Sequence, residues 1–353
     1  MTPWLTSLNA HLSGRLHQFV QRRRQAGPLS VLTYCGYGTP TRIRVDGRVL
    51  RPVQLSNTSE MDSRWRNLQN IVRRFASREA AGVRVVGEAG GTRVEARTDV
   101  EGYFSFTLNP DRSLEDGWHT VTVSLPEREV RATAPVRVVG QARFGVISDL
   151  DDTVVVTGVT KFWQMMQTVL FGNSHTRLPF PGVGALYRAL VRGPTGAEHN
   201  PVFYVSSSPW NFFDLLWTFL EYRRIPLGPL FLRDWGLHTL RAKHGSHKLE
   251  AIGRLLSTYE QLPFVLIGDS GEQDPEIYRE VVRAYPGRVL AVYIRDVTGD
   301  ARDETLRRLR EEVRAQGIDL VVAQDTLGAA VHAHALGLID SAGVRQVLKS
   351  TEE

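Results

Sequence analysis

FGVISDLDDT, at residues 144–153, is the stretch that decides the fold of the C-terminal part of this chain. Its first half is a short apolar run, and its second half contains the acids Asp149, Asp151 and Asp152. A short apolar run that ends in polar residues is typical of a strand buried on both faces of a parallel sheet. The sequence therefore predicts that Asp149 lies at the carboxyl end of a buried strand.

Similar apolar runs follow and alternate with helical patterns. The runs are PVFYVSSS, PFVLIGDS, RVLAVYIRD and IDLVVAQD, and helices are expected near 211–223, 247–257, 275–284, 303–316 and 326–337. This alternation predicts βαβ units and a parallel sheet covered on both faces. In such sheets ligands bind at the carboxyl ends of the strands. Several predicted strands end on polar or acidic residues: Asp149, Ser206, Asp269 and Asp296.

The N-terminal part has a different pattern. Apolar residues at helical spacing predict an amphipathic helix over about 4–24, within a first segment 1–28. Residues 29–140 show alternating apolar positions and Gly-containing turns, which predict a β-rich, sandwich-like module with one inserted helix near 65–76. The Asp-x-x-Gly turn before YFSFTL resembles turns of immunoglobulin-like and transthyretin-like modules. The third predicted domain is 143–353.

The composition is that of a globular protein with room for more than one domain. The 353 residues are 42% hydrophobic and 23% charged, and the formal net charge is +5. A positive surface attracts anionic substrates or acidic lipid, but an Arg-rich surface on a soluble protein explains the charge equally well. Without a basic run interleaved with aromatic residues, we expect no nucleic-acid partner.

The cysteine content and the hydrophobic pattern bear on location. Cys35 is the single cysteine, so neither a disulfide framework nor a CxxC metal site is expected. We find no secretory leader pattern and no apolar run of about 18 residues. These features predict a cytoplasmic protein. The basic helix at 4–24 would suit peripheral contact with an anionic membrane, although packing on its own protein is an alternative.

Asp149 and Asp151 are the sharpest chemical feature. Burying two carboxylates so close together costs several kcal/mol unless a cation or hydrogen bonds compensate them. A divalent cation relieves their repulsion, and oxygen-only ligands favour Mg²⁺ over Zn²⁺. One carboxylate can then attack phosphorus while the other protonates the leaving oxygen. For the five residues DLDDT, 149–153, taken alone, the alternative is an acidic loop without a catalytic role.

Further motifs follow in a consistent order. Ser206, at the end of a strand, offers a hydroxyl to a phosphate oxygen, and Lys248, near a helix start, offers a cation to the same charge. The segment GDSGEQD, residues 268–274, adds the carboxylates Asp269 and Asp274. A serine in a turn or a solvated lysine is common, so each of these is weak alone. Their order along the chain is what makes the pattern informative.

Together these motifs resemble those of the haloacid dehalogenase superfamily, whose first motif is DxDxT. The flanking segments narrow the resemblance to the phosphatidate phosphatases of the actin-patch-protein type: SSSPWN after Val205, HK at 247–248, GDSGEQDPEIY at 268–278, and the stretch NSHTRLPFPGV. The resemblance covers about 143–340. It implies a Rossmann-like phosphatase domain and the Mg²⁺-dependent conversion of phosphatidate to diacylglycerol.

The resemblance also assigns roles to residues of this sequence. Asp149 would be the nucleophile and Asp151 the general acid and base. Asp149, Asp151, Asp269 and Asp274 would form the metal site, with Asp151 acting through its backbone carbonyl and Asp274 orienting the site or the metal's waters. Ser206 and Lys248 would hold phosphate. Substrate binding would involve Thr153, Ser207 and Arg177, although a structural salt bridge explains Arg177 equally well.

The residues between the first two motifs bear on the substrate. The segment TKFWQMMQTVLFG, residues 160–172, is rich in large apolar side chains and in methionine, which adapts to irregular apolar ligands. An ordinary buried helix is the alternative. The insert at 154–201 is too short for a large cap, which predicts an open site suited to a bulky or membrane-presented substrate.

Two other functions remain open at this point. The first is hydrolysis of a soluble phosphomonoester, such as a sugar or nucleotide phosphate. The second is a membrane- or protein-binding scaffold without catalysis, against which the complete set of motif residues argues. The sequence does not predict the acyl-chain preference, the role of the β-rich module or the oligomeric state.

Overall fold

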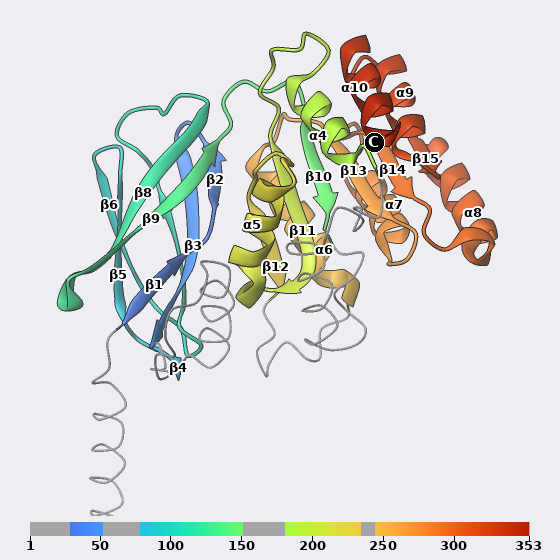
Figure 1. Ribbon diagram of the computed structural model, residues 1–353. Coiled ribbons are helices and arrows are strands. Elements are labelled where there is room, and N and C mark those ends of the chain that lie inside the picture. The colour runs from blue at the N-terminus through green and yellow to red at the C-terminus, as the bar shows by residue number, and fades with distance from the viewer. Residues whose placement is uncertain (1–28, 52–77, 151–180, 234–243, 353) are drawn as a thin grey trace, which may run out of the picture. The chain divides into compact units, whose positions relative to one another are not determined.

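The computed structural model describes residues 29–51, 78–150, 181–233 and 244–352 (Figure 1). The helices predicted at 4–24 and 65–76 and the apolar segment 160–172 lie outside the described residues. The chain divides into two compact units. One contains residues 1–33, 45–108 and 121–134, and the other contains 34–44, 109–120 and 135–353.

The β-rich part of the described chain contains nine strands. Seven follow the hydrogen-bonded order β1-β3-β2-β9-β8-β5-β6, and β4 and β7 both pair with β3. The strands are β1 (Ser30–Thr33), β2 (Gly36–Thr39), β3 (Arg42–Arg51), β4 (Arg78–Glu79), β5 (Arg84–Ala89), β6 (Thr92–Arg97), β7 (Tyr103–Leu108), β8 (Gly117–Leu125) and β9 (Val130–Val138), with a 3₁₀ turn η1 (Pro126–Arg128) before β9. The immunoglobulin-like or transthyretin-like assignment of this part stays a prediction.

The Asp-x-x-Gly turn into β7 is confirmed. The Asp99 carboxylate accepts hydrogen bonds from the backbone N–H groups of Glu101 and Tyr103, at 2.9 and 2.8 Å. Gly102 has φ +83°, in the left-handed region where a side chain would be strained. A Cβ there would also lie 2.5 Å from the Val49 carbonyl oxygen. After this turn, alternate β7 residues are buried, as expected for a strand with one buried face.

The C-terminal part contains a parallel sheet, as the sequence predicts. Its described strands have the order β12-β11-β10-β13-β14-β15, and every neighbouring pair is parallel. They are β10 (Gly145–Asp149), β11 (Val202–Pro209), β12 (Leu230–Arg233), β13 (Phe264–Asp269), β14 (Val289–Arg295) and β15 (Asp319–Ala323). The chain adds β11 and β12 on one side of β10 and then β13 to β15 on the other. The direction of growth therefore reverses between β10 and β13, where ligands bind in sheets of this kind.

The helices predicted after these strands are also present. The helical elements are α4 (Val183–Arg192), η2 (Trp210–Phe212), α5 (Phe213–Tyr222), α6 (His244–Thr258), α7 (Asp274–Ala284), η4 (Gly299–Arg302), α8 (Asp303–Arg314), α9 (Thr326–Ala335) and α10 (Ser341–Glu352). No described helix is long and apolar enough to span a bilayer.

The helices cover both faces of the parallel sheet. Ile147 points to a hydrophobic core that also contains side chains of α6, α7 and α8. Its neighbour Ser148 points to the opposite face, where its hydroxyl hydrogen-bonds the Tyr187 hydroxyl of α4 at 2.6 Å. Burial on both faces explains why FGVIS is an uninterrupted apolar run rather than an alternating one. Because both faces of β10 are covered, its carboxyl end, where Asp149 lies, is the part of the strand that can contact a ligand.

Candidate active site

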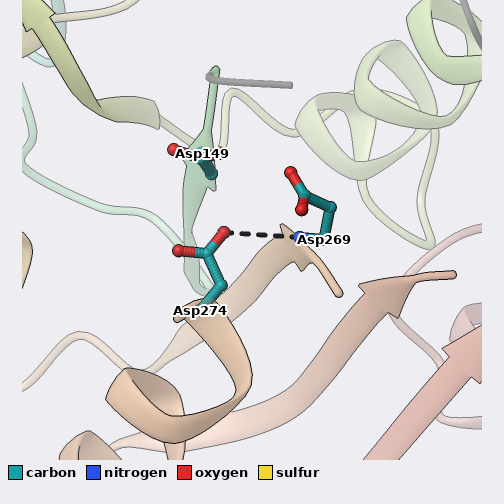
Figure 2. A group of neighbouring side chains, drawn as sticks. All are labelled: Asp149, Asp269 and Asp274. Carbon is teal, nitrogen blue, oxygen red and sulfur yellow. Dashed lines mark hydrogen bonds between the residues drawn. The ribbon is translucent and has the colours of Figure 1, made fainter. Parts of the chain in front are cut away.

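Three carboxylates meet at the point where the sheet changes direction (Figure 2). Asp149 ends β10, Asp269 ends β13 and Asp274 begins α7. One oxygen of each lies within 4.8 Å of an oxygen of the others. The parallel register pairs Ser148 with Ile267, so β10 and β13 deliver their terminal aspartates to the same edge of the sheet. The ends of these two strands therefore lie together.

The loop between β13 and α7 holds two of these carboxylates in place. Asp269 accepts hydrogen bonds from the N–H groups of Gly271 and Glu272, at 2.7 and 3.1 Å. Asp274 accepts one from the Asp269 N–H at 3.3 Å, drawn as the dashed line in Figure 2. A Cβ at Gly268 would collide with the Asp274 carboxylate, so glycine is required for this approach. In the GD pair of the motif, Gly268 is therefore needed for packing against Asp274, and Asp269 supplies a carboxylate to the cluster.

Lys248 of α6 connects the carboxylates. Its ammonium lies 2.7 Å from an oxygen of each of three acids, Asp149, Glu272 and Asp274. Its side chain is 4% exposed. Burial lowers the pKa of Lys248, but the surrounding negative charges raise it by more, so the pKa lies above its ordinary value and the group is a cation. A buried permanent cation beside Asp149 is suited to stabilising negative charge that develops there.

The negative charge at this site exceeds what Lys248 alone balances. Burial, reinforced by the charge of Asp149, raises the pKa of Asp274 well above its ordinary value despite the nearby lysine. Burial likewise raises the pKa of Glu272. A second cation would remove this penalty, and an all-carboxylate set of hard oxygen donors suits a divalent metal of the Mg²⁺ type. The cluster of Asp149, Asp269 and Asp274 is therefore compatible with a metal.

The serine run lies beside Asp149. Strand β11 pairs Val205 with Asp149, so Ser206 and Ser207 continue β11 past the end of β10. Both serines are buried, and the Ser206 hydroxyl oxygen accepts a hydrogen bond from the Ser208 N–H at 3.0 Å. Their location is consistent with the predicted contact to phosphate, which itself stays a prediction.

Asp151, Thr153 and Arg177 lie outside the described residues, so their predicted roles stay predictions. Two other residues have contacts that the sequence reasoning missed. Glu272 binds Lys248, and its position inside GDSGEQD is the signal that could have indicated it. Asp296, noted only as a polar strand end, accepts a hydrogen bond from the Ser270 hydroxyl at 3.1 Å.

This fold and site define an α/β domain whose candidate centre is a carboxylate cluster at the switch point of a parallel sheet. Residues 144–296 match the family model described as "Phosphatidate phosphatase APP1, catalytic domain". Residues 144–296 are therefore similar to the catalytic domain of the APP1 phosphatidate phosphatases, as the motif resemblance indicates.

Two curated proteins are similar to part of this chain. Phosphatidate phosphatase APP1 of Saccharomyces cerevisiae is 31% identical over 177 residues, which cover 49% of this chain and 29% of that protein. An uncharacterized protein of Schizosaccharomyces pombe is 28% identical over 214 residues, which cover 58% of this chain and 34% of that protein. The match thus spans about a third of the length of each relative.

Among solved structures, a carbohydrate acetylesterase from Xanthomonas citri aligns over 89% of this chain and 70% of its own. The TM-score is 0.34 and the sequence identity 11%. A likeness this weak carries no argument about fold or function.

Proposed function

We propose that this protein is a Mg²⁺-dependent phosphatase of the haloacid dehalogenase type that converts phosphatidate to diacylglycerol and phosphate. One observation carries the proposal: Asp149 lies 2.7 Å from the buried Lys248, beside Asp269 and Asp274, within the segment that matches the family. The strand order of the parallel sheet, which reverses beside Asp149, supports the Rossmann-like assignment.

The first chemical step belongs to Asp149. Its carboxylate oxygen attacks phosphorus, the bond from phosphorus to the glycerol oxygen breaks, and Asp151 donates a proton to that oxygen as diacylglycerol leaves. Lys248 stabilises the negative charge on Asp149 and on the phosphoryl oxygens because it is buried and remains protonated. Ser206 and Ser207 offer hydrogen bonds to phosphoryl oxygens from the neighbouring strand.

The second step restores the enzyme. Asp151 takes a proton from water, the resulting hydroxide attacks phosphorus, and the bond between phosphorus and Asp149 breaks to release phosphate. Asp149, Asp269 and Asp274 would hold Mg²⁺, with the backbone carbonyl of Asp151 as a further oxygen ligand. When bound, Mg²⁺ supplies positive charge that offsets the charge of the phosphoryl group.

We also place the protein in the cytoplasm, with peripheral contact at an anionic membrane where its substrate resides. The net charge of +5 and the single cysteine support this location. The predicted substrate-recognition residues Thr153, Ser207 and Arg177 belong to the same proposal.

Phosphate release from phosphatidate in detergent micelles tests the proposal, with and without Mg²⁺. The matched panel contains p-nitrophenyl phosphate, glucose 6-phosphate and AMP, and Asp149→Asn serves as the variant without a nucleophile. We expect Mg²⁺-dependent hydrolysis of phosphatidate that the variant loses. Hydrolysis of the soluble esters alone would replace the lipid with a soluble substrate. Failure of the folded, metal-loaded protein to hydrolyse any of them would favour a binding role.

A further inference from the structure

The loop that joins β13 to α7, residues 270–273, sets the geometry of the carboxylate cluster. Asp269 precedes this loop, Glu272 belongs to it and Asp274 follows it. Three of the acids that surround Lys248 or the candidate metal position therefore depend on one short segment. Because like charges repel strongly at a buried site, a loop that carries them needs support from elsewhere in the fold.

Arg302, at the end of η4, contacts this loop in two places and the first turn of α7 in a third. One nitrogen of its guanidinium, Nη1, donates to the carbonyl oxygens of Ser270 and Glu272, both at 2.6 Å. The other, Nη2, forms an ion pair with the Glu276 carboxylate in the first turn of α7. The Arg302 side chain is 23% exposed, so these contacts are partly shielded from water. The guanidinium presents separate nitrogens to the two loop carbonyls and to Glu276, a spread of donors that a lysine ammonium, with all its N–H groups on one nitrogen, does not reproduce.

The residues just before Arg302 provide a second connection. The buried Ser270 hydroxyl donates to Asp296 at 3.1 Å and accepts from the Val297 and Thr298 N–H groups, at 2.9 and 3.2 Å. The same Asp296 oxygen accepts from the N–H groups of Thr298 and Gly299, both at 3.1 Å. The segment 296–302 is thus hydrogen-bonded to both ends of the 270–273 loop. Most of this segment lies beyond the residues that match the family model, which end at 296.

We propose that Arg302 is a positioning residue, which holds the 270–273 loop so that Asp269 and Asp274 converge with Asp149 on a bound divalent cation. This inference rests on the metal site of the proposed function. Arg302 acts through the loop, because its charge is paired with Glu276 and its other contacts are to backbone carbonyls. Loss of residues that orient metal ligands typically weakens metal binding by about 10- to 100-fold.

Titration of the full-length, metal-free protein with Mn²⁺, followed by electron paramagnetic resonance of the free ion, tests the proposal. The variants are Arg302→Lys, which keeps the charge for Glu276 but loses the fork, and Glu276→Gln, which removes the ion pair. Arg307→Lys is the matched control, since Arg307 is an exposed residue whose ion pairs are with Glu304 and Glu311, outside the site. Thermal unfolding of each variant in chelator reports folding separately.

We expect Arg302→Lys to raise the Mn²⁺ dissociation constant at least about tenfold. Glu276→Gln should raise it less, and Arg307→Lys should leave it unchanged. The half-saturating Mg²⁺ concentration for phosphate release should rise in parallel with the Mn²⁺ constant. Wild-type Mn²⁺ affinity in folded Arg302→Lys would overturn the proposal, and so would an equal loss in Arg307→Lys or an absence of Mn²⁺ binding to the wild-type protein. Because Mn²⁺ binding needs no substrate, the proposal can hold even if phosphatidate is not the substrate.

Discussion

Replacing Lys248 with methionine should damage stability and catalysis by separable amounts. The side chain is 4% exposed and lies 2.7 Å from each of Asp149, Glu272 and Asp274. Methionine keeps much of the length and removes the charge. Removing one partner of a buried ion pair costs about 3–5 kcal/mol, because the remaining charge is left uncompensated. We expect a loss of that size in the free energy of unfolding of the metal-free protein.

Lys248→Met should also lower kcat, and by more than partial unfolding of the variant would explain. Removing one group that stabilises developing negative charge typically lowers kcat by about 10²–10³-fold. Lys248 contacts the proposed nucleophile itself, so we expect at least this factor in phosphate release at saturating Mg²⁺. Added Mg²⁺ should recover part of the lost stability, because a second cation at the carboxylates replaces some of the missing charge.

Urea unfolding with and without Mg²⁺, together with phosphate release, measures both effects. Lys349→Met is the matched control, since Lys349 is an exposed residue of α10. The control should behave as wild type in both assays. An unfolding free energy for Lys248→Met within 1 kcal/mol of the control, or an unchanged kcat, would refute the reasoning from buried charge.

Gly268→Ala should weaken Mn²⁺ binding at least about tenfold in a calorimetric titration, because the new Cβ would displace Asp274. Gly328→Ala, whose Cβ would make an ordinary 3.5 Å contact, should not weaken it. Equal Mn²⁺ affinities in the two variants would contradict this prediction. In chelator, the wild type should gain stability relative to Asp274→Asn as the pH falls from 8 to 5. The raised pKa of Asp274 makes the folded protein bind a proton more tightly than the unfolded chain does. A difference in the free energy of urea unfolding that does not change with pH would argue against this. Tyr187→Phe should cost about 0.5–1.5 kcal/mol of unfolding free energy, since it removes the 2.6 Å hydrogen bond to Ser148. Activity should stay largely intact. A loss above about 3 kcal/mol would mean that the Tyr187 hydroxyl stabilises the fold by more than this one hydrogen bond.

The strand ends of the parallel sheet were predictable because their signal is local. Each strand is a continuous apolar run, and Asp149 and Asp269 follow two such runs directly. Strand β12 was missed, since LFLR is only four residues long and so gives a weak apolar signal. Local pattern therefore predicted the elements that carry the chemistry better than the strand at the sheet edge.

The contacts that orient the site could not be predicted in the same way. Arg302 is one of many arginines in the C-terminal part, and nothing near it in sequence distinguishes it from the surface residue Arg307. Its role depends on β14 returning the chain to the carboxyl edge of the sheet next to the 270–273 loop. Glu272 is similar, because its contact with Lys248 requires α6 and the loop to meet across the fold. Sequence spacing indicates which residues have suitable chemistry, whereas packing decides which of them touch.

The reversal of strand order between β10 and β13 also has a consequence during synthesis. Asp149 emerges from the ribosome with the first strand of the parallel sheet, but Asp269 and Asp274 follow about 120 residues later, on the other half. A nascent chain that has formed β10, β11 and β12 has the proposed nucleophile, Asp149, but neither of these partners. Because the centre depends on contacts between residues far apart in sequence, it assembles late. If the proposed function holds, an unfinished chain has no complete carboxylate cluster with which to act on phosphate esters.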